Sequence, residues 1–329
     1  MALITVNAGG LYCPAGDFYV DPWRPAARAV ITHAHGDHLR AGSGEYLLAR
    51  PGAALARRRL APDARLRALE YGEPIDLGGV RVSLHPAGHV LGSAQVRLEH
   101  GGEVWVVSGD YKRDPDPTCA PFEVVPCDVF ISEATFALPV YRWTAAPTIA
   151  AEIHAWWMAN RERGLASVLF AYALGKAQRV LAELAALTSE PVYVHGAVAS
   201  LVEDYREAGV TMLPTLAPEA TRRADYRGAL VLAPPSAAGS PWMRRFGEAS
   251  TGFCSGWMRV RGDRRRRGYD RGFVLSDHAD WPSLLRTFRA TGARRILLTH
   301  GHTETLCRYL REQGVDAAAL ATDYGAEDA

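Results

Sequence analysis

The chain has 329 residues, of which 48% are apolar and 22% charged, and its formal net charge is +1. This length allows two ordinary domains with substantial cores, and the composition is ordinary for a soluble globular protein. A net charge so close to zero predicts neither nucleic-acid nor membrane binding, so any such binding must come from a local cluster of charge.

Membrane and disulfide architectures are both disfavoured. No segment approaches the roughly 20 uninterrupted apolar residues of a membrane span. The N-terminal residues show no basic segment followed by an apolar run, so no secretory signal is expected. The five cysteines are scattered and form no C-x-x-C pair, which favours reduced thiols over a disulfide frame or a thiolate zinc site. We therefore expect a cytoplasmic protein with no membrane partner.

The predicted elements change in character along the chain. Residues 1–143 contain short β-strands separated by Gly, Pro and Asp turns. Helices and strands alternate from about Thr144 to residue 271, which indicates a parallel α/β unit. The chain then continues as strand, helix, strand, helix. The clearest predicted elements are Val80–Leu84, Ala94–Leu98, Val104–Val107, Val129–Ser132, Val168–Ala171, Val192–Val194, Ala229–Leu232, Gly272–Ser276, Pro282–Thr291, Arg295–Thr299 and Thr303–Glu312.

One loop carries an unusual density of metal-binding side chains. The segment His33-Ala-His35-Gly-Asp37-His38 offers four potential ligands within six residues, and it follows the apolar run Ala29-Val-Ile31. It therefore lies at a strand end. Such a loop suits two cations about 3.5–4 Å apart. A chance cluster is a poor alternative, because the whole chain has only 11 histidines.

Three further ligand candidates lie in turns after apolar strands. His89 lies in a glycine-rich turn, Asp110 follows Ser108-Gly109, and His300 follows the strand Arg295–Thr299. A single strand-end histidine or aspartate is often only a turn or cap residue. Together with the histidine loop, however, these three complete two coordination spheres, with Asp110 able to bridge both cations. The sequence therefore predicts a site for two divalent metal ions.

This pattern of H-x-H-x-D-H, G-H, S-G-D and T-H-G resembles the metallo-β-lactamase superfamily, whose fold is an αββα sandwich. The resemblance implies that one metal binds His33, His35 and His89. It implies that the other binds Asp37, His38 and His300, with Asp110 bridging, and that the cations are zinc or manganese. Asp21 resembles an aspartate that supports the ligand loop without binding metal.

Three more motifs resemble those of the β-CASP nucleases within this superfamily. Ser132-Glu133 resembles motif A, Ser276-Asp277-His278-Ala-Asp280 motif B, and Thr299-His300-Gly301 motif C. The resemblance implies a metallo-β-lactamase domain in two parts, 1–143 and 272–329, with an inserted α/β β-CASP domain at 144–271. Gly175-Lys176 also resembles a helix start of that insert, although an ordinary cap is the alternative.

Within the β-CASP nucleases, the chain is most similar to the bacterial ligase-associated DNA exonucleases, through Pro86–Gln95 and motif B. This resemblance implies a DNA exonuclease that digests from the 5′ end in DNA repair, with an ATP-dependent DNA ligase and a helicase as partners. A metal centre at the floor of a cleft between two domains would admit one threaded strand more readily than a duplex. We therefore expect single-stranded DNA or overhangs as the substrate.

Other functions stay open. His300 at motif C is more typical of RNA-cutting members, so an RNA-directed β-CASP nuclease is the main alternative. A small-molecule metallohydrolase is more distant, because such members lack the insert and motif B. A scaffold without turnover is disfavoured by the complete set of ligands.

The resemblance also implies catalytic roles. Asp37 would ligate one metal and orient the attacking hydroxide. His278 would contact the scissile phosphate and donate a proton to the leaving oxygen, and Glu133 would hold the tautomer and orientation of His278. We interpret Ser93 as a turn cap and Lys112 as a surface lysine.

A run of arginines precedes the strand that leads to His278. A solvated basic loop is the default interpretation of such a run, but the neighbouring motifs favour contacts with phosphate backbone. The arginines predicted to bind nucleic acid are Arg264, Arg265, Arg266 and Arg267.

Overall fold

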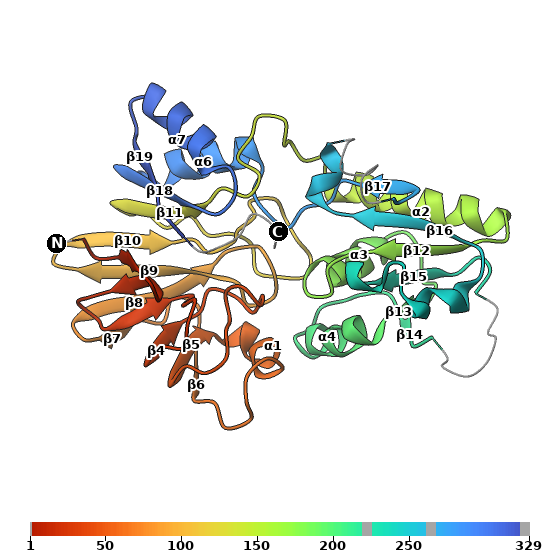
Figure 1. The fold of residues 1–329 in the computed structure, drawn as a ribbon, viewed down its shortest axis with the longest axis horizontal. Helices are drawn as coiled ribbons and strands as arrows, with labels where there is room; N and C mark the ends of the chain where they lie inside the picture. Colours follow the sequence, from red (N-terminus) through yellow and green to blue (C-terminus); the bar gives the residue numbers. More distant parts are fainter. Residues whose placement is uncertain (1, 219–225, 261–267, 323–329) are drawn as a thin grey trace. The chain divides into compact units, whose positions relative to one another are not determined.

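The computed structural model describes residues 2–218, 226–260 and 268–322. Three sheets and several helices make these residues a mixed α/β protein (Figure 1), which confirms the expected class. The chain divides into two compact units, one of Met1–Arg142 with His278–Ala329 and the other of Trp143–Asp277. None of the helices in the described ranges has the length and apolar character that a membrane crossing requires.

The first unit begins with a six-stranded sheet whose strands pair in chain order. Its first three strands pair antiparallel and the later ones parallel. A 3-10 turn, η1 (Arg50–Gly52), and a short helix, α1 (Ala53–Arg57), connect its last two strands. The strands are β1 (Thr5–Asn7), β2 (Gly10–Cys13), β3 (Phe18–Val20), β4 (Arg28–Val30), β5 (Glu45–Ala49) and β6 (Leu66–Leu69).

A seven-stranded sheet completes the first unit, in the order β19-β18-β11-β10-β9-β8-β7. Its strands are β7 (Ile75–Leu77), β8 (Val80–Pro86), β9 (Ala94–His100), β10 (Glu103–Val107), β11 (Val129–Glu133), β18 (Arg295–Thr299) and β19 (Asp316–Ala319). β8 and β10 both pair antiparallel with β9, and β10, β11 and β18 pair parallel. The strands β8, β10, β11 and β18 therefore all end at the same edge of the sheet.

Alternating side chains of this sheet serve two cores. Val107, Ile131 and Leu297 pack with residues of the first sheet. Their neighbours Val106 and Phe130 pack instead with α6 (Trp281–Thr291) and α7 (Thr303–Glu312). Because both faces of these strands are covered, their sequences are continuously apolar and do not alternate with polar residues. The result is a layer of helices, then a sheet, then a second sheet.

The second unit is built on a parallel sheet in the order β14-β13-β15-β12-β16-β17. Its strands are β12 (Ala166–Phe170), β13 (Val192–Val194), β14 (Thr215–Leu216), β15 (Leu230–Ala233), β16 (Ala249–Cys254) and β17 (Arg271–Phe273). Three helices cover one face, namely α2 (Ala146–Glu162), α3 (Lys176–Leu184) and α4 (Gly196–Glu207). The other face packs under the 3-10 segments η2 (Pro235–Ala237), η3 (Pro241–Phe246) and η4 (Gly256–Arg259).

The position of β17 bears on the predicted boundaries. The sequence assigned a strand at Gly272–Ser276 to the last segment of the first domain. The structure has β17 at Arg271–Phe273, paired parallel with β16, so this strand belongs to the sheet of the second unit. The last segment of the first unit therefore begins at His278 rather than at residue 272. The assignment of the two units to named domains stays a prediction.

Candidate metal centre

The candidate ligands follow strand ends. The histidine loop follows β4, Asp110 follows β10, and His300 follows β18. His89 lies in the turn between β8 and β9, and Glu133 is the last residue of β11. Strands of one direction deliver their side chains to the same edge of a sheet, which explains how residues more than two hundred positions apart meet.

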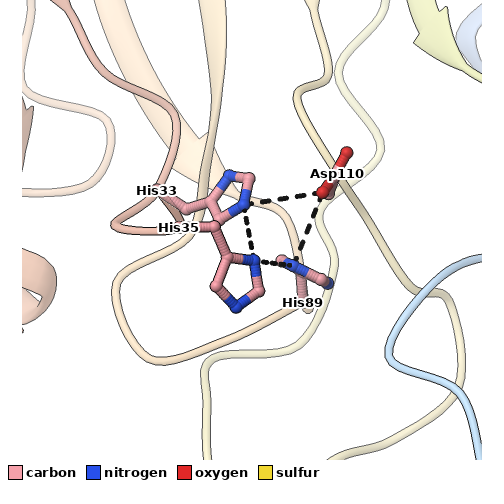
Figure 2. Close-up of side chains that lie close together, drawn as sticks. All are labelled: His33, His35, His89 and Asp110. Atoms are coloured by element: carbon pink, nitrogen blue, oxygen red, sulfur yellow. Dashed lines mark hydrogen bonds and ion pairs between the residues drawn. The ribbon is translucent and has the colours of Figure 1, made fainter. Parts of the chain in front are cut away.

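The first group consists of His33, His35, His89 and Asp110, which form a closed ring (Figure 2). His35 Nδ1 lies 3.0 Å from His33 Nε2 and 3.1 Å from His89 Nε2. Asp110 Oδ2 lies 3.5 Å from His33 Nε2 and 3.7 Å from His89 Nε2. All four ligand atoms lie within 4.8 Å of one another.

This ring fits a cation better than a hydrogen-bond network. His35 Nδ1 faces two other ring nitrogens, and one proton satisfies only one such contact. A tetrahedral zinc ion with bonds of about 2.0–2.1 Å would hold neighbouring nitrogens about 3.3 Å apart, close to the separations found here. Asp110 Oδ1 is also buried with no hydrogen-bond partner among the described residues. A buried carboxylate oxygen without a partner is costly, so it points to a second cation.

The second group consists of Asp37, His38 and His300. His38 Nε2 lies 3.5 Å from Asp37 Oδ2 and 3.5 Å from Asp110 Oδ2. The rings of His38 and His300 stack with centroids 5.3 Å apart. Since Asp110 Oδ2 lies close to ligand atoms of both groups, its carboxylate is where a bridge between two cations would be.

Asp21 fixes two of the imidazole rings. Its Oδ2 lies 2.7 Å from His38 Nδ1 and accepts a 2.6 Å hydrogen bond from the hydroxyl of Thr32. That hydroxyl donates its hydrogen bond to Asp21, so toward His33 Nδ1, which lies 3.1 Å away, it acts as the acceptor. The Nδ1 atoms of both rings are thus held on the side of Asp21 and Thr32, and their Nε2 atoms face the other ligand candidates. Asp21 thus has the supporting geometry that was expected of it.

Thr299 and His300 repeat this construction. The hydroxyl of Thr299 donates to the carbonyl of Ser132 at 3.3 Å and lies 2.8 Å from His300 Nδ1. His300 has a left-handed backbone, with φ of 55°, which is uncommon for a residue with a side chain and occurs most often at functional sites. Gly301 follows in the same conformation, and a Cβ there would lie 2.4 Å from the carbonyl oxygen of Ala134. The third motif therefore needs glycine after its histidine.

A third group adjoins the first two. His278 Nδ1 lies 2.9 Å from Glu133 Oε2, and the other oxygen of Glu133 accepts a 2.8 Å hydrogen bond from the backbone N–H of Tyr111. The carboxylate of Glu133 is buried, while the ring of His278 is partly exposed. His278 Nδ1 also lies 4.0 Å from Asp110 Oδ2. Glu133 thus holds His278 beside the metal ligands.

Burial and charge set the protonation of the ligands. Burial lowers the pKa of His33 well below its usual value and that of His300 to about 4, so both rings are neutral at pH 7. Burial alone would also lower the pKa of His38, but Asp110, Asp21 and Asp37 raise it well above its usual value. Burial would raise the pKa of Asp110, yet the imidazoles of His38 and His278 hold it well below its usual range. These carboxylates attract positive charge, which a bound cation also supplies.

Several other predicted residues have clear positions. Ser93 Oγ accepts the backbone N–H groups of His89 and Val90, which confirms a turn cap. The interpretation of Lys112 as a surface lysine is wrong, because the residue is buried and its ammonium lies 2.9 Å from Asp116. Gly175 starts α3 as a cap, whereas Lys176 is buried. The four arginines predicted to bind nucleic acid, Arg264 to Arg267, lie outside the described residues.

Sequence reasoning missed the two threonine hydroxyls. A signal was present, because the dipeptide Thr-His occurs at both Thr32-His33 and Thr299-His300, each time after an apolar strand. A hydrogen-bond acceptor beside a metal-binding histidine fixes which of its ring nitrogens carries the proton.

Two curated proteins that act on nucleic acid by name are similar in sequence to this chain. No protein-family profile matches the chain. A probable DNA ligase of Opitutus terrae is 33% identical over 316 residues, which are 95% of this chain and 31% of that protein. The endoribonuclease YSH1 of Saccharomyces cerevisiae is 31% identical over 121 residues, which are 36% of this chain and 15% of that protein. The chain thus spans less than a third of the length of these two curated relatives.

A solved structure resembles the fold. The crystal structure of a protein of unknown function from Enterococcus faecalis superposes with a TM-score of 0.60 and 12% sequence identity. The superposition covers 91% of this chain and 80% of the other. This fold therefore occurs in another protein, and the two curated relatives described above carry the names of enzymes. The histidine and aspartate groups are of the kind that binds divalent metals.

Proposed function

We propose that this chain is a two-metal nuclease of the β-CASP branch of the metallo-β-lactamase superfamily. The observation that carries the proposal is the meeting of seven ligand candidates in two groups around Asp110, with the pair of Glu133 and His278 beside them. A layer of helices on two packed sheets, with a separate α/β unit between the two segments of the chain that form them, supports the sandwich and its insert.

Each metal would have its own set of ligands. His33, His35 and His89 would hold one ion, Asp37, His38 and His300 the other, and Asp110 would bridge them. Two bound divalent cations, zinc or manganese, make water acidic enough to attack near neutral pH and neutralise charge on the phosphate oxygens. The neutral rings of His33 and His300 suit this role, because metal ligation needs a free lone pair.

The remaining residues would act on the substrate. Glu133 accepts the Nδ1 proton of His278, which leaves Nε2 of that ring for the substrate. His278 would contact the scissile phosphate and pass a proton to the leaving oxygen. Asp37, whose carboxylate is partly exposed, would ligate one ion and orient the attacking group.

DNA is the proposed substrate. The relative named as a DNA ligase matches 95% of the chain, whereas the endoribonuclease matches 36%. We propose an exonuclease that digests single strands or overhangs from the 5′ end, in repair beside an ATP-dependent DNA ligase and a helicase. An RNA-directed nuclease is the second candidate, because His300 and the likeness to an endoribonuclease both favour it.

One assay separates these substrates. Protein reconstituted with zinc or manganese is given DNA and RNA oligonucleotides of the same sequence, each labelled separately at the 5′ and 3′ ends, and nitrocefin in parallel. Early release of a 5′-labelled mononucleotide from DNA, with stepwise shortening of the 3′-labelled strand, is the expected result. Stepwise shortening of the 5′-labelled strand reverses the polarity, and preferential digestion of RNA favours the second candidate. Hydrolysis of nitrocefin alone contradicts a nuclease.

A further inference from the structure

A second group of arginines lies within the first unit, close to the histidine loop. Residues 50–67 contain six arginines and a single acidic residue, Asp63. This concentration is notable in a chain whose net charge is only +1. Three of the arginines, Arg57, Arg58 and Arg59, are consecutive and exposed where α1 ends.

The arginines differ in what their side chains contact. The guanidinium of Arg50 pairs with Glu70, and that of Arg57 donates to the carbonyl of Ala64 at 2.7 Å. Arg59 has no ion pair with any carboxylate in the described ranges. Its backbone N–H donates to the carbonyl of Ala56, which anchors its main chain at the end of the helix. The side chain itself stays exposed, so its charge is not neutralised.

The guanidinium of Arg59 lies against the histidine loop. A Cβ built on Gly36 would be 3.1 Å from Arg59 Nη1 and 3.9 Å from Arg59 Cζ. Gly36 stands between two ligand candidates, His35 and Asp37, and consecutive Cα atoms are about 3.8 Å apart. The charge of Arg59 is therefore at the rim of the candidate metal centre. A larger residue than glycine at position 36 would meet this guanidinium.

We propose that Arg59 binds a phosphate of the nucleic-acid strand that neighbours the scissile one. This inference rests on the proposed nuclease function and names a contact for the same site. A planar guanidinium binds phosphate oxygens in a two-pronged manner and stays charged at all pH values of interest. The seven ligand candidates would hold the cations for the scissile phosphate, so the charge at the rim would serve the next phosphate along the strand. Arg59 is distinct from the run at Arg264 to Arg267, which comes much later in the sequence.

The experiment compares Arg59→Gln with Arg289→Gln as a matched control. Arg289 is an exposed arginine in the last turn of α6, about 12 Å along that helix from its first residue. Each holoprotein is assayed with a DNA oligonucleotide, with the matched RNA and with bis(p-nitrophenyl) phosphate, which has no neighbouring phosphate. Metal content is measured in each preparation.

Arg59→Gln is expected to lower kcat/KM on the oligonucleotide by about 10- to 100-fold, since hydrogen bonds between charged groups are among the strongest. Hydrolysis of the chromogenic diester and the metal content should not change. The slope of the logarithm of the binding constant against the logarithm of salt concentration should become shallower by about 0.7, as expected for one lost phosphate contact to a single strand. Arg289→Gln should resemble the unmodified protein in every assay.

A modified substrate identifies the contact itself. Oligonucleotides with one neutral methylphosphonate linkage are prepared, placed in turn at each linkage beside the first one cleaved. At one position, the methylphosphonate should lower kcat/KM of the unmodified protein by the same factor as Arg59→Gln does on ordinary DNA. The same linkage should not lower kcat/KM of the Arg59→Gln variant any further. Equal losses in both proteins at every position overturn the assignment of Arg59.

The other outcomes are also distinguishable. If Arg59→Gln loses metal or activity on the chromogenic diester, Arg59 supports the histidine loop and the inference is wrong, while the nuclease function stands. If Arg59→Gln cleaves nucleic acid as well as Arg289→Gln does, only the inference is wrong. If the unmodified protein hydrolyses the chromogenic diester but neither DNA nor RNA, the proposed function and the inference are both overturned.

Discussion

At the scale of single residues, the hydroxyl of Thr299 lies beside a candidate metal ligand, His300. The hydroxyl of Thr299 donates a hydrogen bond to the carbonyl of Ser132, so it acts as the acceptor for Nδ1 of His300. The hydroxyl therefore fixes which nitrogen of His300 is available to a metal.

Thr299→Val keeps the shape of this side chain and removes the acceptor. Loss of such a supporting contact typically weakens metal binding by about 10- to 100-fold. We expect this loss in chelator competition, whereas Thr299→Ser should keep most of the affinity. Equal metal affinities of the Thr299→Val and Thr299→Ser variants would show that the hydroxyl does not orient His300.

The proposed role of His278 can be separated from metal binding by experiment. It is held by Glu133, yet it also forms a possible ligand group with Glu133 and Asp110. As a proton donor it would contribute about 10²–10⁴-fold to turnover without binding metal. His278→Ala should therefore lose that much activity and retain both ions by elemental analysis.

Two controls belong with this variant. His302→Ala removes a nearby imidazole that is in none of the ligand groups found among the described residues, and it should keep both metal and activity. Asp110→Ala should lose metal and activity together. If His278→Ala loses metal in the same way, His278 is a ligand and not a proton donor.

At the scale of elements, a buried ion cluster ties α3 to the end of the second unit. Lys176 Nζ lies 2.7 Å from Asp277 Oδ2, and Arg179 Nη1 lies 3.3 Å from Asp277 Oδ1. The same guanidinium donates to the carbonyl of Ser276 at 2.6 Å. Asp277 is the last residue of its unit, so this cluster anchors the chain just before His278.

Asp277→Ala removes the carboxylate that pairs with the buried side chains of Lys176 and Arg179. Removing one member of a buried ion pair usually costs about 3–5 kcal/mol of unfolding free energy. We expect a clear loss of stability in denaturant titration, followed by circular dichroism. Arg308→Ala, which removes an exposed ion pair with Glu312 on α7, should cost no more than about 1 kcal/mol. Similar values for the two variants would contradict a stabilising role for the buried cluster.

Elements differ in how well the sequence predicts them. The strand Arg295–Thr299 and the helix Thr303–Glu312 have the bounds predicted from the sequence, because an apolar run and a helical repeat are separated there by Gly301. The strands β1 to β4 have three or four residues each, too few to show a period. β17 was assigned to the wrong sheet, since strand pairing is decided by residues distant in the chain.

For the site, the sequence predicts ligand types better than their support. The seven ligand candidates stand in short motifs, and side chains at strand ends meet when the strands share a direction. The burial of Lys112 and the hydrogen bonds of the Thr32 hydroxyl could not be predicted, because both depend on packing between segments that are far apart in the sequence. The role of the arginines 264–267 stays a prediction, because they lie outside the described residues.

For the whole molecule, metal removal should measure how much the centre contributes to stability. Without cations, the site gathers several carboxylates and histidines in a small buried volume. A ligand that binds only the folded state at 100 times its Kd adds about 2.7 kcal/mol. Dialysis against a chelator should therefore lower the melting temperature, and added zinc or manganese should restore it. An unchanged melting temperature, with metal loss verified by elemental analysis, would contradict a stabilising centre.

The division of the first unit by an insert also affects how the protein is made. β11 pairs with β18, and the hydrogen bond between Thr299 and Ser132 spans 167 positions in the chain. At a synthesis rate of about 5–20 residues per second, roughly 8–30 s pass between the synthesis of β11 and that of its partner strand β18. During that time its apolar edge is open to pairing with other chains. A ribosome stalled before residue 295 would therefore hold the nascent chain in a form especially prone to aggregation.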